Sequence, residues 1–313
     1  MKKVIDFISA RKIFFAISLS IILIGVICNF IFGTTLDIQF SGGAMIKFSY
    51  TGEVNTEELK SFIQGETDDT VTFSSSQDIM NSKDGKNAYT ISVQFSGTDA
   101  IDKELQKNLL EKVTEKYPDN DFAVMESSSV ESQMGFMFLM KCLTAVAIAS
   151  ALMVLYVTIR FKRIGGLSAG VFALVALFHD IAIIYFLYVI FRMPIDGNFI
   201  AVVLMILGYS LNDTIVVYDR VREERKRLGS KASVAQVFNV SATRVMKRTI
   251  FTSITTLAAI GTVYVVATIF NIETVKSFAL PMMAGVISGC YSSLCIAGPL
   301  WVMWKERKEK SEK

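Results

Sequence analysis

"ILGYSLNDTIVVYDRVREER" (Ile206–Arg225) joins an apolar run typical of a membrane-spanning helix to a strongly charged segment. Within the apolar part, Asn212 and Asp213 interrupt the run together. An ionised carboxylate inside a bilayer costs about 2.5–3.5 kcal/mol even on the insertion scale, so it persists only if it is paired, hydrated or neutralised. We therefore expect Asp213 to have a functional role.

The same alternation of apolar blocks and charged segments extends over the whole chain of 313 residues, which is 52% hydrophobic with a mean hydropathy of +0.45. A transmembrane helix needs about 20 consecutive apolar residues. The sequence therefore predicts a polytopic α-helical membrane protein with six transmembrane helices. The six blocks are Ile13–Phe32, Phe136–Ile159, Ile164–Phe191, Asn198–Tyr218, Thr249–Phe270 and Phe278–Trp304.

The first block follows a basic N-terminus, as a secretory signal also does. It is longer than a usual signal h-region of about 7–15 residues, and no A-x-A-like site follows it. Ile27 stands before Cys28, where a lipoprotein signal needs a small residue. We expect a retained membrane anchor, with a cleaved signal as the alternative.

Basic residues are distributed unequally between the predicted loops. They cluster at the N-terminus, in the turn Arg160–Arg163, in the segment Asp219–Arg248 and in the C-terminal tail, whereas the other two turns carry only Arg192 and Lys276. The positive-inside rule then places both termini in the cytoplasm. Residues 34–133 lie outside, and their 8 Lys against 18 Asp and Glu give a net charge of −10. Such acidity favours a soluble domain over one that binds lipid phosphates or nucleic acid.

The outer segment has the pattern of a small α+β domain. Its order, β-α-β-β-α-β, suggests an extracytoplasmic ferredoxin-like domain of about 100 residues between helices one and two. The predicted elements are a strand over Leu36–Tyr50, a helix over Asn55–Gln64 capped by Thr56 or Asn55, the strands "TVTFSSS" and "AYTISVQF", a helix over Thr98–Tyr117 and the strand "DFAVMESSSV".

Two local features of this domain carry further expectations. The polar stretch "QDIMNSKDGKN" predicts a hairpin tip around Asp84-Gly85. The glycines of "SGG" (Ser41–Gly43) indicate a bulge or a close backbone approach more than a binding site. Because the domain has no histidine, no cysteine and no phosphate-binding glycine motif, we expect a binding or lever-like role and no catalysis.

The four cysteines all lie within apolar blocks and show no C-x-x-C spacing. This placement is typical of small core residues and not of a disulfide framework or a metal site. We expect no metal and no cofactor.

His179 and Asp180 lie side by side midway along the third block, so both are near the bilayer centre. Ionisable residues at that depth are either functional or tightly paired. The alternative is a structural hydrogen bond between helices, worth about 0.6 kcal/mol. A relay role and a structural role both remain open for this pair.

Asp213 lies roughly 7–8 Å from the cytoplasmic end of the fourth span, too deep for its short side chain to reach the interface. Arg248 begins the fifth span at the same edge and is long enough to pair with Asp213, either as part of a proton relay or as a structural ion pair. Hydroxyl and amide groups that are able to order water lie nearby, namely Ser210, Asn212, Thr214, Thr252 and Thr255.

Small residues and prolines mark the sixth span. Gly285 and Gly289 form a small-xxx-small motif typical of close helix packing. Pro281 and Pro299 either bend this helix or mark its boundaries. The basic segment after Tyr218 is typical of an interfacial anchor that can attract anionic lipid.

Several of these stretches together resemble the SecF subunits of the SecD/SecF family, in the resistance-nodulation-division superfamily. They are "LDIQFSGG", "ALFHD", "GYSLNDTIVVYDRVRE", "KRTIFTSITT" and "GVISGCYSSLCIAGPL", in the family's order over nearly the whole chain. The resemblance implies a multi-pass protein of the bacterial plasma membrane that pairs with SecD and assists the SecYEG channel, often with YajC and YidC. Proton flow would then drive the outer domains to assist an unfolded preprotein, while SecA uses the ATP.

The resemblance also assigns residues. Asp213 matches the family's proton-relay aspartate, Arg248 matches the arginine implicated in the same relay, and His179 with Asp180 matches the family's "HD" pair. The chain departs from some relatives in having "KRT" where "SRT" is common, which leaves the relay residues unchanged.

The predicted chain has four parts: a cytoplasmic N-terminus with the first transmembrane helix (1–33), the outer domain (34–133), a five-helix bundle (134–304) and a basic cytoplasmic tail (305–313). Two other functions remain open, a proton-coupled exporter of small molecules or lipids and a passive assembly scaffold. An enzyme is not expected, because no nucleophile–base pair occurs at recognisable spacing.

Overall fold

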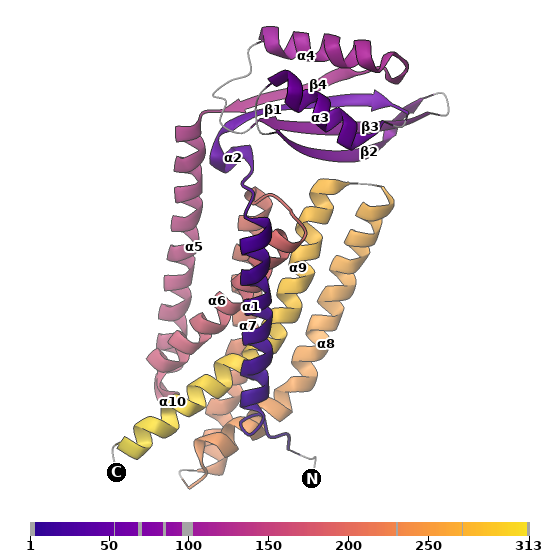
Figure 1. Cartoon of the computed structure of the whole chain (residues 1–313). Coiled ribbons are helices and arrows are strands. Elements are labelled where there is room, and N and C mark those ends of the chain that lie inside the picture. The colour runs from indigo at the N-terminus through magenta and orange to yellow at the C-terminus, as the bar shows by residue number, and fades with distance from the viewer. Residues whose placement is uncertain are drawn as a thin grey trace.

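The computed structural model describes residues 4–52, 54–67, 71–83, 86–95, 103–229, 231–270 and 272–311. It consists of a bundle of long helices with a small domain of helices and strands at one end (Figure 1). Both termini lie at the opposite end of the bundle (Figure 1). The small domain and the two chain ends are thus separated by the length of the helices.

Six helical spans in the described part of the chain are long and apolar enough to cross a membrane. The predicted number of spans is therefore confirmed. The spans are α1 (Arg11–Phe32), α5 (Ser132–Arg160), α6 (Gly166–Ile190), α7 (Gly197–Leu228), α8 (Val234–Ile269) and a continuous run of α9 (Glu273–Ser292), a π-helical segment (Ser293–Ala297) and α10 (Gly298–Ser311).

Two of the helices continue well beyond their apolar blocks. The sequence predicts that the fourth span ends at Tyr218, but α7 continues to Leu228. It predicts that the fifth span begins at Thr249, but α8 begins at Val234. The basic segment after Tyr218 is thus a continuation of a spanning helix.

The sixth span bends at the π-helical segment. Pro281 lies inside α9 without interrupting it, and Pro299 lies in the first turn of α10. Between them, Ser293–Ala297 has π-helical hydrogen bonding, and α10 leaves the bundle at an angle to α9 (Figure 1). A π-bulge changes the local hydrogen-bonding ladder and is a recognised cause of such bends.

The spans divide into a central and a peripheral set. In their most apolar windows, 44% of the residues of α6, 56% of α7 and 67% of the sixth span are buried, against 11% in each of α1, α5 and α8. The central helices are therefore packed against protein on most sides. The peripheral helices leave apolar faces open to lipid or to another membrane protein.

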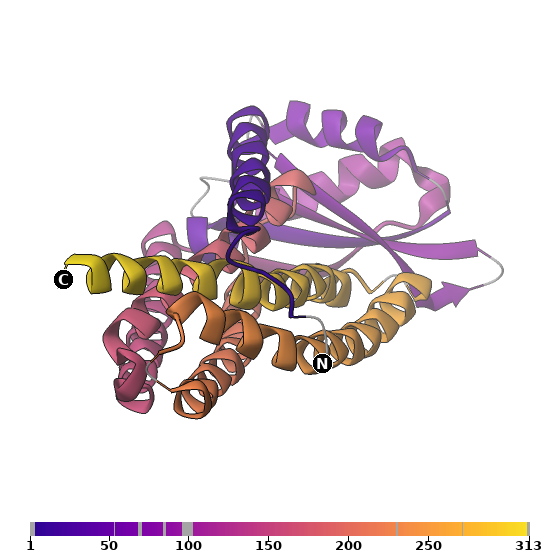
Figure 2. The same ribbon diagram turned by 90° about the horizontal axis from the view of Figure 1, so that it is seen from below.

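The segment before α1 packs against α8. Phe7 is buried with its ring edge-on to that of Phe238, and Asn239 Oδ1 accepts hydrogen bonds from the backbone N–H groups of Phe7 and Ile8 (3.1 and 3.3 Å). Asn239 Nδ2 donates to Asp6 (2.7 Å), and hydrogen bonds, chiefly from Ser9, lower the pKa of Asp6. Figure 2 shows this segment beside the start of α8.

The outer domain is a four-stranded antiparallel sheet with strand order β2-β3-β1-β4. Its order of elements agrees with the predicted β-α-β-β-α-β pattern. Alternate residues of β1, Ile46, Phe48 and Tyr50, share one buried core with both helices, so both cover the same face of the sheet. The elements are β1 (Gly43–Thr51), α3 (Thr56–Thr67), β2 (Val71–Lys83), β3 (Lys86–Phe95), α4 (Lys103–Lys116) and β4 (Ala123–Val130).

The prediction of a strand from Leu36 is wrong over its first part. Residues Ile38–Ser41 instead form a short helix, α2, because the Asp37 carboxylate accepts the N–H of Gln39 (3.0 Å) and caps the turn. The strand begins only at Gly43, and both Gly42 and Gly43 have positive φ angles. "SGG" therefore marks the change from helix to strand.

The remaining predictions for this domain concern the hairpin tip, the cap of the first helix and the start of the second. Most of the polar stretch after Ser76 belongs to the paired strands β2 and β3, while Asp84-Gly85 lies outside the described residues. Asn55 is the cap of α3, since its Oδ1 accepts the N–H of Glu57 (3.1 Å). The other helix begins at Lys103, and residues 96–102 lie outside the described part.

We predict that Gly43→Ala disrupts the pairing of β1 with β3. A Cβ at this position would lie 2.3 Å from the carbonyl oxygen of Phe95, and its φ of +130° is unfavourable for other residues. Backbone strain of this kind costs on the order of 1–3 kcal/mol, and the clash adds to it. Faster amide hydrogen exchange in β1 and β3 of the purified protein is the expected result.

The matched control is Gly65→Ala within α3, where an added Cβ meets nothing within 4 Å. Alanine at an exposed helical position is more favourable than glycine by roughly 0.5–1 kcal/mol, so exchange there should stay the same or slow. Equal exchange rates in the Gly43 variant and the wild type would contradict the argument.

Candidate functional site

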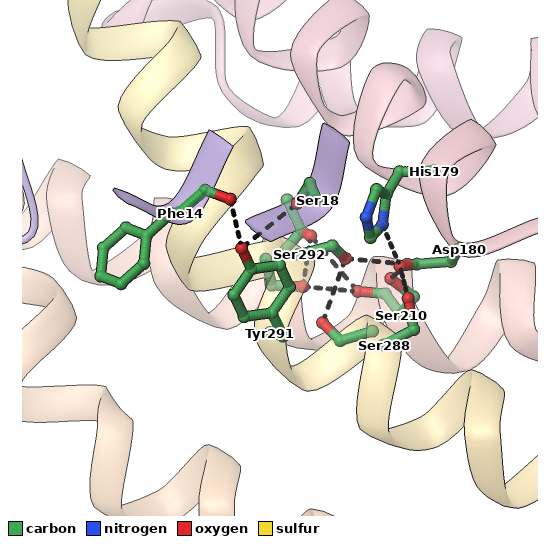
Figure 3. A network of polar contacts seen from close by, with 11 residues as sticks. Phe14, Ser18, His179, Asp180, Ser210, Ser288, Tyr291 and Ser292 are labelled. Atoms are coloured by element: carbon green, nitrogen blue, oxygen red, sulfur yellow. Dashed lines mark hydrogen bonds and ion pairs between the residues drawn. The ribbon is translucent and has the colours of Figure 1, made fainter. Parts of the chain in front are cut away.

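A carboxylate with no solvent exposure belongs to Asp180 on α6. Three serine hydroxyls donate to it, namely Ser210 of α7 (2.6 Å) and Ser288 and Ser292 of α9 (2.5 and 2.8 Å). Nδ1 of His179 lies 3.2 Å from Oδ1 of the same group. Figure 3 shows these side chains converging on one carboxylate.

The carboxyl group of Asp180 is a fully hydrogen-bonded acceptor. The hydroxyl-to-carboxyl distances of 2.5–2.8 Å lie in the normal range for O–H···O hydrogen bonds. A buried polar group is tolerated only when it is hydrogen-bonded, because no water replaces the lost solvation. Ser288 and Ser292 lie one turn apart on α9, so the carboxylate links α6, α7 and α9 at one level of the bundle.

A second set of contacts adds α1 to the cluster. The hydroxyl of Tyr291 donates to the backbone oxygen of Phe14 (2.7 Å) and lies 3.2 Å from Oγ of Ser18. The rings of His179 and Tyr291 lie 6.2 Å apart, and Nε2 of His179 is buried without a hydrogen-bond partner. Figure 3 shows both residues between α1 and the Asp180 cluster.

Asp213 has a different environment. Its side chain is 3% exposed, and its Oδ2 is buried without a hydrogen-bond partner. Within the described residues, no Lys, Arg or His nitrogen lies within 4.0 Å of this carboxylate, so the expected direct pair with Arg248 is not formed. The Arg248 guanidinium is nevertheless near enough to act on the carboxylate electrostatically.

The orientation of α8 explains the missing ion pair. Arg248 and Thr252 are both exposed on the outside of the bundle, and the Thr252 hydroxyl donates to the Arg248 carbonyl (2.9 Å) of its own helix. Thr255 likewise donates to Thr252 (2.8 Å). Arg248, Thr252 and Thr255 therefore point away from the interior of this chain.

The hydroxyl and amide groups predicted around Asp213 are separated in the same way. Ser210 bonds to Asp180, and Thr214 lies 2.9 Å from Ser293, whereas Asn212 is exposed. The residues predicted to order water thus form two groups, one buried around Asp180 and one on the surface of α7 and α8.

The two glycines of the sixth span allow α9 to approach α7 closely. A Cβ at Gly285 would lie 2.6 Å from Ile206, and one at Gly289 would lie 2.9 Å from Cβ of Ser210. The second contact is directly beside the Asp180 cluster. The absence of side chains at these positions brings the serines of α9 within reach of the carboxylate.

Sequence reasoning missed a third buried carboxylate, Glu224, at the end of α7. It is fully buried and forms ion pairs with Arg220 (2.9 Å), Arg227 (2.8 Å) and Arg244 of α8. The spacing of the first two arginines around Glu224, four before and three after, is a helical-face signal that identifies this pairing in the sequence. Ser288 and Ser292 were also missed, although they too are four residues apart.

Among the described residues, no group of three or more His, Cys, Asp or Glu side chains is arranged to hold a metal ion. The four cysteines are free.

We predict that Ser292→Ala destabilises the bundle by about 1–3 kcal/mol, because it removes a donor from a buried acceptor. Asp180→Ala should cost more, because it leaves three buried hydroxyls without their acceptor. The measurement is the melting temperature of the purified protein in detergent.

Thr262→Ala is the control for loss of a hydroxyl in a spanning helix, since Thr262 is exposed and bonds only to the Ala258 carbonyl of its own helix (2.9 Å). If Ser292→Ala and Thr262→Ala melt at the same temperature, the serine cluster does not stabilise the bundle.

Comparisons of this chain with protein families and with individual known proteins agree with one another. A family model described as "Protein export membrane protein SecD/SecF, C-terminal" matches residues 109–307. The protein translocase subunits SecF of Borreliella burgdorferi and Petrotoga mobilis are each 32% identical, over 96% and 99% of this chain and 97% and 99% of their own lengths. The protein translocase subunit SecDF of Bacillus subtilis is 32% identical over 98% of this chain, which spans 39% of that longer protein.

Two crystal structures of SecDF proteins are similar in fold. The SecDF of Thermus thermophilus, described as a translocon-associated membrane protein, matches 98% of this chain with a TM-score of 0.79 and 26% identity. A SecDF in a super-membrane-facing form matches all of it with a TM-score of 0.66 and 25% identity. This chain spans 39% and 40% of those two chains.

Proposed function

Because the chain belongs to the SecD/SecF family of protein-export membrane proteins, we infer that it is an accessory subunit of Sec protein translocation, and we propose that it uses the proton motive force to assist a preprotein. The observation that carries the proton step is Asp213, a carboxylate buried in a spanning helix with one oxygen unpartnered. A group in that state can take up and release a proton without first breaking a hydrogen-bond network.

The chain is a multi-pass bacterial membrane protein, and we propose its orientation. Both termini would lie in the cytoplasm, in agreement with the basic segments at that end of the bundle, and the acidic outer domain would lie outside. The strand order and the shared core of α3 and α4 support a ferredoxin-like domain. We also propose the division into residues 1–33, 34–133, 134–304 and 305–313.

A SecD partner is supported by the relatives, because the Bacillus subtilis protein and the SecDF structures contain a further part beyond the region that this chain matches. We propose that this partner covers the exposed faces of α1, α5 or α8. SecYEG, SecA, YajC and YidC would be further partners, and an unfolded preprotein would be the substrate. The relatives are named as translocase subunits, which agrees with a non-catalytic role.

Asp180 and Asp213, the buried carboxylates within the apolar part of the spans, would have different tasks. Asp180 already accepts three hydroxyl donors and would hold its helices in place, whereas Asp213 has an oxygen to spare. Arg248, on the outside of α8, would act as the movable charge of the relay, because its approach to Asp213 favours the ionised carboxylate and its withdrawal favours the protonated one. Protonation would then be coupled to the relative position of α7 and α8.

We predict that Asp213→Asn abolishes the part of preprotein export that depends on a proton gradient. Asparagine keeps the size of the side chain and one acceptor oxygen but does not titrate. The measurement is export of a preprotein into membrane vesicles that contain this chain and its SecD partner, with ATP and SecA, with and without a gradient. Gradient-dependent export should fall to background while the partner still copurifies.

Asp219→Asn is the matched control on the same helix, because Asp219 is half-exposed and pairs with Arg160 (3.1 Å) and Arg222 (2.8 Å) at the surface. It should retain the full response to the gradient. If Asp213→Asn also retains it, the carboxylate is structural and the proposed proton role is wrong. Loss of the partner in that variant would instead support the assembly scaffold.

A further inference from the structure

The link between α1 and the outer domain is hydrogen-bonded to the turn between α6 and α7. The N–H of Ile195 donates to the Thr35 carbonyl (2.9 Å), and the N–H of Asp37 donates to the Ile195 carbonyl (3.0 Å). Leu36 and Ile195 form an isolated parallel β-bridge. The backbone that enters the outer domain is therefore attached to the residues that immediately precede α7.

Two helices begin at this junction, and each is capped by an aspartate. Asp37 caps α2 through the N–H of Gln39, and Asp196 caps α7 through the N–H of Phe199 (3.1 Å). Burial raises the pKa of Asp196, and the negative charge of Asp37 raises it further. The two carboxylates thus interact electrostatically across the junction.

The second oxygen of Asp37 extends the junction to the sheet. Nε2 of Gln94 donates to it (2.8 Å), and Gln94 belongs to β3, a strand with neighbours on both sides. A continuous set of hydrogen bonds therefore runs from the start of α7 through Ile195 and Asp37 to the interior of the sheet.

α7 is the helix that carries Asp213. Asp213 lies sixteen residues after Gly197, a span of roughly 24 Å at 1.5 Å per residue, in one unbroken helix. A helix of this kind moves as a rigid element, so a shift or rotation at Asp213 also moves the backbone at its N-terminal end.

The outer domain is not sealed against the bundle at this place. A cleft of about 570 Å³ separates the sheet from the start of α7 and is lined by Ser92 and Gln94 on one side and Asp196 and Asn198 on the other. Apart from this junction, the domain is held by α2 against α5, where the rings of Phe40 and Phe138 stack at 5.5 Å. Contact at α5 with an open cleft beside α7 leaves room for the sheet to tilt.

We propose that Asp37 is a positioning residue that couples α7 to the sheet of the outer domain, through its backbone bond to Ile195 and its side-chain bond with Gln94. The coupling rests on the proposed function, since it transmits the movement that proton transfer at Asp213 starts. Asp37 and Gln94 take no part in the proton step itself.

The test is Gln94→Ala, which removes the donor to Asp37 and leaves the backbone bridge and the cap of α2 in place. The matched control is Ser92→Ala, on the same strand, the same face and the same cleft. Each variant is reconstituted with its SecD partner in membrane vesicles, and both gradient-dependent export and proton flux are measured with ATP and SecA present. Copurification of the partner and amide exchange in β3 show that the variants are folded.

The expected result for Gln94→Ala is a fall in gradient-dependent export of at least threefold, with proton flux and gradient-independent export at the wild-type level. Ser92→Ala should match the wild type in all three. This separation of flux from export is not expected from a general loss of stability. A second variant, Asp37→Asn, turns an acceptor of the Gln94 amide into a competing donor and should show the same separation.

Two outcomes overturn the coupling. Export by Gln94→Ala and Asp37→Asn at the wild-type level would show that the junction transmits nothing, and an equal loss of flux and export would show a structural role only. Failure of the proposed function looks different, because the wild type itself would then lack gradient-dependent export.

Discussion

The packing of the bundle depends on the carboxylate of Asp180. A carboxyl group with no solvent exposure must have its hydrogen bonds supplied by the protein, and here three serine hydroxyls from two neighbouring helices supply them. This requirement fixes the rotation of α7 and α9 about their axes, since either helix turned away would leave the carboxyl group without donors. The glycine at position 289 makes the same contact sterically possible.

The carboxylate of Asp213, in contrast, has an oxygen atom without a hydrogen-bond partner. It lies on α7 one turn from Ser210, so the helix that is held by the Asp180 cluster also sets the position of the unpartnered carboxylate. Two aspartates in the same membrane region therefore differ in kind. One is saturated with donors and stabilises a fixed arrangement, and the other keeps an acceptor free in a place where a change of charge alters the balance between neighbouring helices.

Both ends of α7 are anchored by polar contacts outside the apolar region. At one end, Glu224 forms ion pairs with three arginines and connects α7 to α8. At the other, Asp196 caps the helix beside the bridge to the outer domain. α7 is thus in contact with the central cluster, with α8 and with the outer domain. Its length beyond the apolar block is what brings these three regions together.

The sequence by itself determined the six spans, the order of strands and helices in the outer domain, and the presence of carboxylates at Asp180 and Asp213 within the membrane region. These are local properties, since the length of an apolar run and the alternation of residues do not depend on distant parts of the chain. Only the tertiary structure decided which groups each carboxylate meets. It gave Asp180 the serines of α7 and α9, directed Arg248 to the surface, and began β1 at Gly43 because Asp37 caps a short helix before it. A hydrogen-bond partner depends on the rotation and separation of two packed elements, and no window of the sequence contains both.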